Sequence, residues 1–418
     1  MNQGQRQMSG YVLYTAIALA FSPHAAAHQP GSAKSCTDER IWAAVERAQP
    51  EQIKLLGDLV AIDTGTGEVE GTARAYALLE PFLAALDAHI ERVPAEVAGL
   101  PDNLVVTFAG RGVGRRLIIA HIDTVFETGT AASWPFEISN TMASGPGVSD
   151  SKGGLVTALF ALKSIRDLGI TAFEKITLLI DSSEEKGSIG SRALIERLSR
   201  SHDLVLNMEP GIAPDGIVTW RKGSGNIRLT VSGRAAHAGV APQDGRNAAI
   251  ELLNQLSPIP SLPSSGDGMT VNLTMVDAGT RTNIIPDEAE AVLNVRVREQ
   301  AQLDTLLKDM GRRAAAPRVV DTTVTVRYDG SFPPQPEAAR NAPAIARAKA
   351  IYAEIGRELT TGGSGGGSES ALSQAAGTVV IDGLGPVGTG FHSREERVDL
   401  STFSPRLYLL TRLLMAGE

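Results

Sequence analysis

The chain has 418 residues, and its 39 Lys and Arg residues stand against 47 Asp and Glu residues, which gives a formal net charge of −8. Hydrophobic residues make up 43% and charged residues 21%, which excludes a disordered or coiled-coil chain and is typical of a soluble globular protein. The acidic balance argues against a nucleic-acid binder. The single cysteine, Cys36, excludes an intramolecular disulfide and a cysteine-based zinc cluster.

Residues 1–27 have the order of features that is typical of a secretory signal peptide. Arg6 is the only Lys or Arg there, an apolar run covers residues 11–21, and a small-residue stretch ends at Ala27. The run is shorter than the roughly 20 residues that a membrane-spanning helix needs. We expect cleavage near residue 27 and a periplasmic or secreted mature protein that makes no membrane contact. A membrane anchor or a disordered tail is the alternative.

Predicted helices and strands alternate after this segment. Near-continuous apolar strands between helices are typical of a mostly parallel sheet that is buried on both faces. Helical spacing of apolar residues predicts helices over 51–62, 72–86, 155–168 and 189–198, and apolar runs predict strands over 103–109, 116–121, 175–181 and 203–208.

The pattern changes after Gly223 and changes back near Pro334. Between them the predicted order is β-α-β-β-α-β, which is typical of a ferredoxin-like α+β domain. We therefore expect an α/β fold whose larger domain comprises residues 28–223 and 335–418, with a smaller domain inserted at 224–334. The insert has predicted strands at 226–231, 270–276, 289–297 and 322–326 and helices at 247–256 and 300–310. Helices at 342–355 and 405–415, a glycine-rich loop at 362–367 and a strand at 378–381 follow it.

A histidine and several carboxylates stand at or near the ends of the predicted strands. His121 ends one strand, and Asp123 follows two positions later. Residues at i and i+2 of an extended chain share a face, so one of these side chains could bind a metal ion while the other fixes the imidazole. A surface turn with a capping aspartate is the alternative. Asp150 lies in a loop that opens a later helix, where a lone aspartate is usually an N-cap, but its position after the His121–Asp123 strand end raises a role in a joint site as the alternative.

Glu184 and Glu185 follow the strand KITLLID. Two carboxylates at the end of a buried strand are costly unless they bind a cation or are hydrated. Adjacent side chains diverge, so one could bind metal while the other transfers a proton. A solvated acidic turn is the alternative.

Glu209 ends a further predicted strand. His392 follows the last predicted strand, where it could also be a histidine at the entry to a helix.

Imidazoles and carboxylates of this kind suit a dinuclear zinc-type site, in which a carboxylate bridges two ions ~3.5–4 Å apart. Their order along the chain favours one joint site over separate structural roles. The candidate residues are His121, Asp150, Glu185, Glu209 and His392, with Asp123 and Glu184 as further acids.

On these residues the chain resembles the dinuclear-zinc metallopeptidase family of glutamate carboxypeptidase, aminoacylase and acetylornithine deacetylase. It is most similar to the glutamate carboxypeptidase branch, and the similarity extends from about residue 45 to the C-terminus. The resemblance implies that the larger domain is a catalytic zinc domain and that the insert is a lid through which a homodimer forms. The motifs that carry it are HIDTV, GVSDSKGG, SSEEKGSIGSR, NMEPG, AAHAG, NIIP, GGGSES and FHS.

The resemblance also implies a role for each candidate residue and two Zn²⁺ ions per subunit. His121 and Glu209 would hold one zinc, Glu185 and His392 the other, and Asp150 both. Asp123 would orient His121, and Glu184 would be the general base and acid. His237 of the lid would reach the partner's site to help stabilise an oxyanion, and Asn283, Arg296 and Gly366 would contact substrate. A lid-surface histidine, a turn residue and an ordinary sheet-face cation are the alternatives for His237, Asn283 and Arg296.

The expected reaction is hydrolysis of the amide bond that links a C-terminal amino acid, glutamate by this resemblance, to an N-acyl or peptidyl group. A deacylase of N-acyl amino acids, a dipeptidase and a non-catalytic binding protein are the alternatives.

Two places in the sequence depart from the pattern of this family. Glu369 stands where many relatives carry Asp, and segment 328–333 lacks the arginine of the glutamate-preferring branch. Arg221 or Lys222 could supply a cation instead.

Overall fold

A computed structural model describes residues 38–258 and 268–415, which belong to one compact unit. The predicted signal peptide and Cys36 lie outside the described residues. Within the described ranges, no helix has both the length and the apolar character that crossing a membrane requires.

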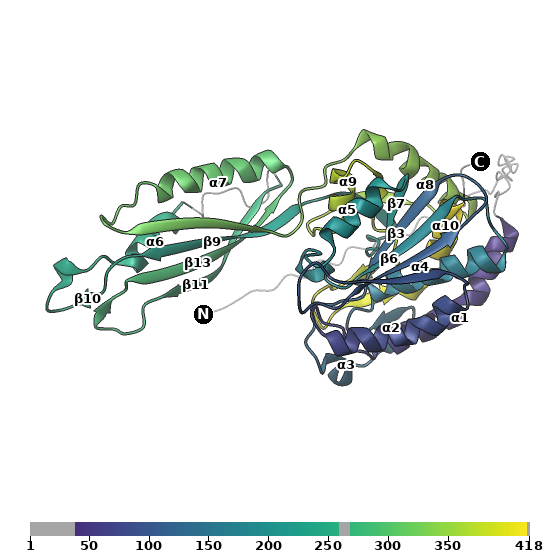
Figure 1. Ribbon diagram of the computed structural model, residues 1–418, viewed down its shortest axis with the longest axis horizontal. Helices are drawn as coiled ribbons and strands as arrows, with labels where there is room; N and C mark the ends of the chain where they lie inside the picture. Colours follow the sequence, from purple (N-terminus) through teal and green to yellow (C-terminus); the bar gives the residue numbers. More distant parts are fainter. Residues whose placement is uncertain (1–37, 259–267, 416–418) are drawn as a thin grey trace, which may run out of the picture. The chain divides into compact units, whose positions relative to one another are not determined.

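The larger part of the fold is built on a six-stranded sheet with the order β1-β2-β6-β3-β7-β16 (Figure 1). Strands β6, β3, β7 and β16 are parallel to one another, whereas β2 runs antiparallel to both of its neighbours, β1 and β6. Residues 94–102 alone join β1 to β2, and a parallel pair would need a longer crossover. The predicted, mostly parallel α/β sheet is thus confirmed. The strands are β1 His89–Val93, β2 Asn103–Ala109, β3 Arg115–His121, β6 Lys175–Asp181, β7 Leu204–Asn207 and β16 Val379–Ile381.

Helices cover both faces of this sheet, and alternation along each strand divides the core in two. In β3, Ile118 and Ala120 pack into one cluster, while Leu117 and Ile119 pack into the other. The first cluster lies under α1 Glu39–Val60, α2 Val69–Ala84, α4 Lys152–Asp167, α8 Ala342–Glu354 and α10 Phe403–Leu414. The second lies under α5 Arg192–Arg200 and α9 Glu369–Ala375.

Helix α1 begins twelve residues before the predicted start at residue 51. The Asp38 carboxylate caps it by accepting hydrogen bonds from the backbone N–H groups of Arg40 and Ile41. Pro50 lies inside the helix, yet the first turns persist because Ile41 and Val45 are buried in the core.

Two small sheets complete the larger part. β15 Thr360–Ser364 pairs in parallel with β8 Gly216–Arg221, so the expected glycine-rich loop at 362–367 is wrong for its first half, which is a strand. Backbone pairing with β8 orders these residues although their side chains carry no strand pattern. The other small sheet has the order β17-β18-β5-β4, from β17 Gly388–Thr389, β18 Arg397–Asp399, β5 Met142–Ser144 and β4 Glu137–Ser139.

The inserted segment forms a four-stranded antiparallel sheet with the order β11-β13-β9-β14. It has a hydrophobic core of its own, in which Leu229 and Leu293 of the sheet pack with Leu252 and Leu306 of two helices. The predicted ferredoxin-like α+β insert is therefore confirmed as a fold. Its elements are β9 Gly223–Ser232, α6 Ala248–Leu256, β11 Thr270–Ala278, β13 Glu288–Val297, α7 Gln300–Ala314 and β14 Thr323–Gly330, with short strands β10 Ala236–His237 and β12 Ile284–Ile285.

Candidate metal centre and active site

The carboxyl ends of the parallel strands bring the candidate residues to one edge of the sheet. His121 is the last residue of β3, Glu184 and Glu185 lie in the turn after β6, and Glu209 follows β7. Ligand crevices of such sheets form at this edge. Asp150 reaches it from the loop before α4, and His392 reaches it from the turn between β17 and β18.

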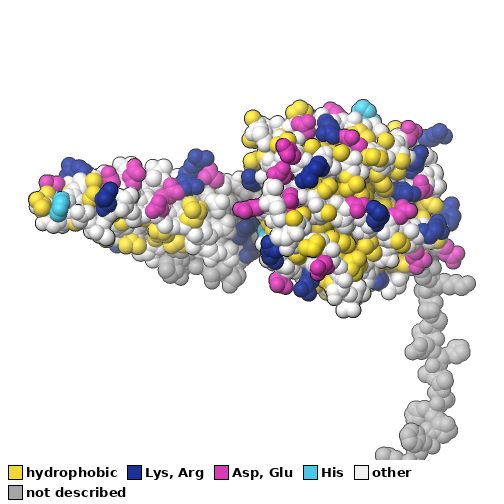
Figure 2. All heavy atoms as spheres, turned by 90° about the horizontal axis from the view of Figure 1, so that it is seen from below, with side chains coloured by type: hydrophobic (Ala, Val, Ile, Leu, Met, Phe, Trp, Pro, Cys, Tyr) yellow, Lys and Arg dark blue, Asp and Glu magenta, His cyan; other side chains and the backbone are white. Residues whose placement is uncertain are grey.

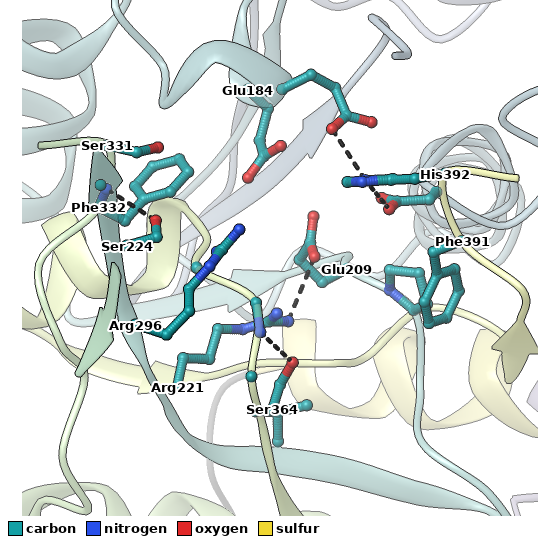
Figure 3. Close-up of a pocket in the computed structure, with 18 of the residues that line it drawn as sticks. Glu184, Glu209, Arg221, Ser224, Arg296, Ser331, Phe332, Ser364, Phe391 and His392 are labelled. Carbon is teal, nitrogen blue, oxygen red and sulfur yellow. Dashed lines mark hydrogen bonds and ion pairs between the residues drawn. The ribbon is translucent and has the colours of Figure 1, made fainter. Parts of the chain in front are cut away.

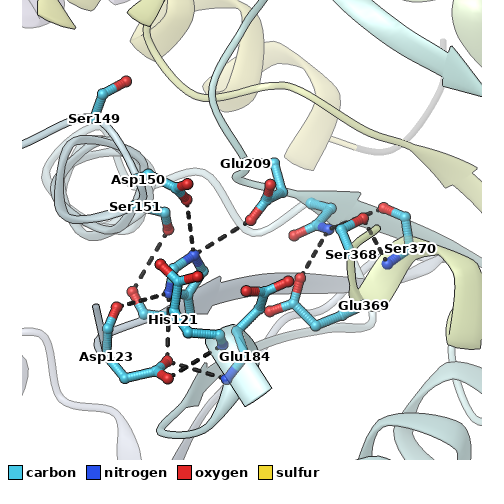
Figure 4. A network of polar contacts seen from close by, with 12 residues as sticks. His121, Asp123, Ser149, Asp150, Ser151, Glu184, Glu209, Ser368, Glu369 and Ser370 are labelled. Atoms are coloured by element: carbon cyan, nitrogen blue, oxygen red, sulfur yellow. Dashed lines mark hydrogen bonds and ion pairs between the residues drawn. The ribbon is translucent and has the colours of Figure 1, made fainter. Parts of the chain in front are cut away.

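Asp150 lies between the two histidines. Its Oδ1 is 3.2 Å from His121 Nε2, and its Oδ2 is 3.4 Å from His392 Nε2. Glu209 Oε1 is 3.3 Å from His121 Nε2, and Glu185 Oε2 is 3.1 Å from His392 Nε2. Two histidine–carboxylate pairs therefore share Asp150 (Figure 4 shows the His121 side). We call these five residues, His121, Asp150, Glu185, Glu209 and His392, the His–carboxylate cluster.

Asp123 connects His121 to the turn that carries the paired glutamates. His121 Nδ1 is 3.0 Å from the Asp123 backbone oxygen and 3.4 Å from its Oδ1. The Asp123 carboxylate also accepts hydrogen bonds from the backbone N–H groups of Glu184, at 3.0 Å, and Glu185, at 3.2 Å (Figure 4). Donation from Nδ1–H to Asp123 would leave Nε2 of His121 available to bind a metal ion on the side of the carboxylates.

Burial and mutual repulsion raise the pKa values of several of these carboxyls. Burial, together with the nearby Glu209, raises the pKa of Glu184 well above its usual range. Burial and the Asp150 charge raise the pKa of Glu185 to about 7. Hydrogen bonds to Asp150 and Glu185 raise the pKa of His392 to about 10. The arrangement concentrates negative charge that a cation would stabilise.

The residues fit a divalent metal ion. Glu209 Oε1 is buried and makes no hydrogen bond, and its contact with His121 Nε2 is only one of distance. The coordinating atoms of His121, Asp150 and Glu185 lie within 4.8 Å of one another, as do those of His121, Glu184 and Glu209. Imidazole nitrogens and carboxylate oxygens are ligands that zinc prefers in catalytic sites.

A cavity of about 570 Å³ lies beside the cluster (Figure 3). Glu184 and four of the cluster residues line it, all except the buried His121. Arg221 and Arg296 extend into it from strands β8 and β13. Other lining residues are Ser224, Asn226, Asn294, Ser331, Phe332, Phe391 and residues 364–367, which include Gly366.

The two arginines of the cavity differ in their partners. Arg221 donates to both carboxylate oxygens of Asp382, at 2.6 and 3.0 Å, and its Nη2 is 3.3 Å from Glu209 Oε2. Arg296 is half-buried and donates from Nε to Asn294 Oδ1 at 3.3 Å. Among the described residues, Arg296 makes no ion pair with a carboxylate, so its charge is available for an anion.

His237 and Asn283 do not line this cavity. His237 is exposed on β10, and its Nδ1 accepts hydrogen bonds from the backbone N–H groups of Gly239 and Val240. The backbone oxygen of Asn283 accepts from Ala238 N–H at 2.9 Å, which places these two segments together within the insert.

Three buried acids near the cluster have roles that sequence reasoning did not identify. Asp382 pairs with Arg221, and Glu396 accepts backbone hydrogen bonds from the loop of Asp150. Glu369 is fully buried, with Oε2 accepting from Asn207 at 3.1 Å and Oε1 unpartnered. Burial and Glu209 raise its pKa well above the usual range. In the sequence, Glu396 is marked only as an acidic residue four positions after His392, and this position does not indicate its contacts.

Comparison with known proteins identifies the family. The profile of peptidase family M20/M25/M40 matches residues 117–416. The chain belongs to this family. The predicted family is thus confirmed, and the chain is an M20 metallopeptidase.

Two curated relatives of this M20 metallopeptidase match nearly their whole length. Carboxypeptidase G2 of Pseudomonas sp. (strain RS-16) is 34% identical over 381 residues, which cover 90% of this chain and 92% of the relative. A succinyl-diaminopimelate desuccinylase of Methylorubrum populi is 30% identical over 366 residues, which cover 81% and 92%.

Solved structures share the fold of this M20 metallopeptidase. A tripeptidase of Staphylococcus aureus superimposes with a TM-score of 0.76 at 21% identity, covering 88% of this chain and 98% of the other. The M20 family metallo-carboxypeptidase Sso-CP2 of Sulfolobus solfataricus superimposes with a TM-score of 0.68 at 17% identity, covering 91% and 99%.

Proposed function

We propose that this chain is a dinuclear zinc exopeptidase, which hydrolyses the amide bond between a C-terminal amino acid and an N-acyl or peptidyl group. The observation that carries the proposal is the position of Asp150 between His121 and His392, at the wall of a cavity that also contains Arg296.

Two Zn²⁺ ions per subunit would be held by the His–carboxylate cluster. His121 and Glu209 would bind one ion and Glu185 and His392 the other, with Asp150 between them. Metal ions bound here would lower the pKa of a water molecule and polarise the scissile carbonyl.

Glu184 is the general base and acid of the proposed reaction. Its side chain lines the cavity, and its backbone is fixed by Asp123. Neighbouring Glu185 turns toward His392, at 3.1 Å, so the two glutamates serve different tasks. Glu184 takes a proton from the attacking water and passes it to the leaving amine.

Arg296 binds the free α-carboxylate of the substrate in this proposal, since its charge has no carboxylate partner among the described residues. Gly366 lines the same cavity and leaves room for the substrate backbone. Glutamate is the proposed C-terminal residue, supported by the relative named carboxypeptidase G2. The relative named a desuccinylase supports an N-acyl amino acid deacylase as the second candidate, with a dipeptidase of the same family beside it.

The insert, residues 224–334, is proposed as a lid through which two copies form a homodimer, and residues 28–223 and 335–418 as the catalytic domain. Strand β11 is an edge strand of the insert's sheet. Its Leu273, Met275 and Val276 are 44%, 64% and 54% exposed, and Leu253 of α6 is 60% exposed. Exposed apolar side chains grouped on one segment are typical of an interface. In the dimer, His237 would reach the partner's cavity.

The distribution of surface charge supports the proposal that the chain does not bind nucleic acid. Figure 2 shows Lys and Arg side chains interspersed with Asp and Glu over the visible face. Interspersed charge does not attract a polyanion as a continuous basic face would. Periplasmic or secreted localisation is proposed from residues 1–27 alone.

A substrate panel tests the proposal. N-acyl amino acids, including N-acyl glutamates, and dipeptides are incubated with the mature protein, with and without a chelator. We expect release of the C-terminal amino acid, loss of turnover with chelator and recovery with Zn²⁺. Turnover by a folded preparation that contains no bound metal would contradict the dinuclear site, and a preference for dipeptides with a free amino group would favour the second candidate.

A further inference from the structure

Glu396 is a buried carboxylate that the proposed reaction does not use. Glu396 is 1% exposed and does not line the cavity. It stands directly before β18, at the end of the turn that carries His392. A buried carboxylate is costly unless hydrogen bonds or charges compensate it, so its contacts indicate what it does.

Within the described part of the chain, the hydrogen bonds that the Glu396 carboxylate accepts come from the loop before α4, which contains Asp150. Its Oε1 accepts from the backbone N–H groups of Ser149, at 2.9 Å, and Asp150, at 3.0 Å. Its Oε2 accepts from Gly147 N–H at 3.3 Å. A buried N–H group without a hydrogen-bond partner is costly, so the conformation of this loop depends on the Glu396 carboxylate.

The loop needs such support because its backbone is tightly constrained. Gly147 has a φ of +71°, a conformation that residues other than glycine rarely adopt. A Cβ atom there would lie 2.5 Å from the Thr124 side chain. Ser151, which precedes helix α4, makes no capping hydrogen bond with its side chain. The Glu396 carboxylate therefore accepts hydrogen bonds from backbone N–H groups near the helix start, where the Ser151 side chain makes no capping bond.

The backbone of Glu396 belongs to the turn that carries His392. Glu396 N–H donates to the Ser393 backbone oxygen at 3.1 Å, and Ser393 Oγ donates to the Gly390 backbone oxygen at 2.7 Å. The His392 side chain itself is 56% exposed. Its position opposite Asp150 Oδ2, at 3.4 Å, thus depends more on this turn than on packing of the ring.

We propose that Glu396 is a positioning residue, which joins the His392 turn to the Asp150 loop and so holds two ligands of the proposed metal site in one geometry. The inference rests on the proposed function, since it needs the cluster to bind metal. Removing a hydrogen-bonding partner behind a ligand typically weakens metal affinity about 10–100-fold.

The test is a titration of metal-free protein with Zn²⁺ alone, in competition with a chromophoric chelator, for wild type, Glu396→Gln and Glu395→Gln. The glutamine keeps one acceptor oxygen and places an amide N–H₂ group against a backbone donor. Glu395 is the matched control, because it is the adjacent residue, its side chain is 80% exposed and it pairs with Arg397 on the surface. We expect about 10–100-fold weaker Zn²⁺ binding for Glu396→Gln and wild-type binding for Glu395→Gln.

Two further measurements separate positioning from a general effect on folding. The absorption spectrum of the Co²⁺-loaded protein should change in Glu396→Gln, because it reports ligand geometry. Glu396→Asp keeps the charge but withdraws the carboxylate by one methylene, and it should also weaken Zn²⁺ binding; it serves alone if the glutamine variant does not fold. Unchanged affinity and spectrum, even with a lower melting temperature of the metal-free protein, would overturn the inference. Absence of Zn²⁺ binding by the wild type would instead refute the proposed function.

Discussion

Arg221 and Asp382 form a buried two-point ion pair behind Glu209. The guanidinium donates from Nε and Nη2 to the two carboxylate oxygens of Asp382, and both residues are almost inaccessible to solvent. The same Nη2 lies 3.3 Å from Glu209 Oε2. Ser368 Oγ and Gly383 N–H complete the hydrogen bonds of Asp382. The fixed charge of Arg221 thus orients Glu209 toward His121.

Asp382→Asn should destabilise the protein by about 3–5 kcal/mol, because it leaves the Arg221 charge buried and poorly compensated. Urea denaturation of the metal-free protein measures the loss. Asp329→Asn is the matched control, since Asp329 pairs with Arg327 at 2.7 Å on the surface, and exposed pairs contribute about 0–1 kcal/mol. Equal small effects of both substitutions would contradict the role given to the buried pair.

Glu184→Gln should lower kcat by at least ~10²-fold, because general acid–base catalysis typically supplies 10²–10⁴-fold. The amide preserves the shape of the side chain and removes its proton-transfer capacity. Steady-state kinetics measures the loss, and elemental analysis of the purified variant should find as much zinc as in the wild type. Near-normal turnover with full metal content would rule out Glu184 as the base.

Met275→Lys should convert the proposed dimer to monomers, because a charge would replace an apolar side chain that is 64% exposed on the edge strand β11. Light scattering of wild type and variant measures the mass. Val320→Lys is the control, since Val320 is 71% exposed and lies between α7 and β14 rather than on β11. A monomeric wild type would remove the basis for a role of His237 in the partner's site.

Mixing inactive Glu184→Gln and His237→Ala subunits tests that role directly. If His237 acts across a two-fold interface, half of the randomly re-formed dimers contain one complete site, so about a quarter of wild-type activity should return. Activity that stays at the level of the separate variants after subunit exchange would place His237 outside the partner's site.

His202 should make the protein less stable in acid. It is buried, with Nε2 2.9 Å from Thr177 Oγ1 and Nδ1 2.7 Å from the Leu198 backbone oxygen, and burial lowers its pKa to about 4. The unfolded chain binds the proton near pH 6.5, so the stability that the neutral ring contributes is full above that pH and falls as the pH drops toward 4, by up to about 3 kcal/mol.

Urea denaturation between pH 4 and 7.5 measures this loss, and His202→Gln should flatten the pH dependence. His89→Gln is the control, because His89 is exposed on β1 and no stabilising role is expected for it. The same slope in wild type and His202→Gln would show that other groups cause the acid sensitivity.

The sequence predicted the parts of the fold that depend on local patterns. The apolar runs of β3, β6 and β7 are continuous, so the residues that follow them, among them Glu184 and Glu209, could be expected at one edge of the sheet. The predicted bounds of β2 and β6 agree with the structure because their apolar runs are well bounded, and the predicted order of elements in the insert agrees because alternation and helical spacing are strong there.

The residues that support the site could not be predicted in the same way. Glu396 acts through backbone N–H groups of residues almost 250 positions earlier, and a backbone donor leaves no trace in the sequence. Asp382 follows a strand of only three residues, β16, and gives no sign of its pairing with Arg221. Strand β15 was missed because its glycines are ordered by β8 and not by their own propensity.

The two histidines of the cluster differ greatly in access to solvent. The His121 side chain is 1% exposed, while that of His392 is 56% exposed. An ion on the His392 side could leave by a small movement of one turn, whereas an ion on the His121 side could leave only after that neighbour had gone or the loops had opened. If the cluster binds two ions as proposed, their loading and loss should therefore be stepwise, and the ion beside His121 should be the one retained when zinc is scarce.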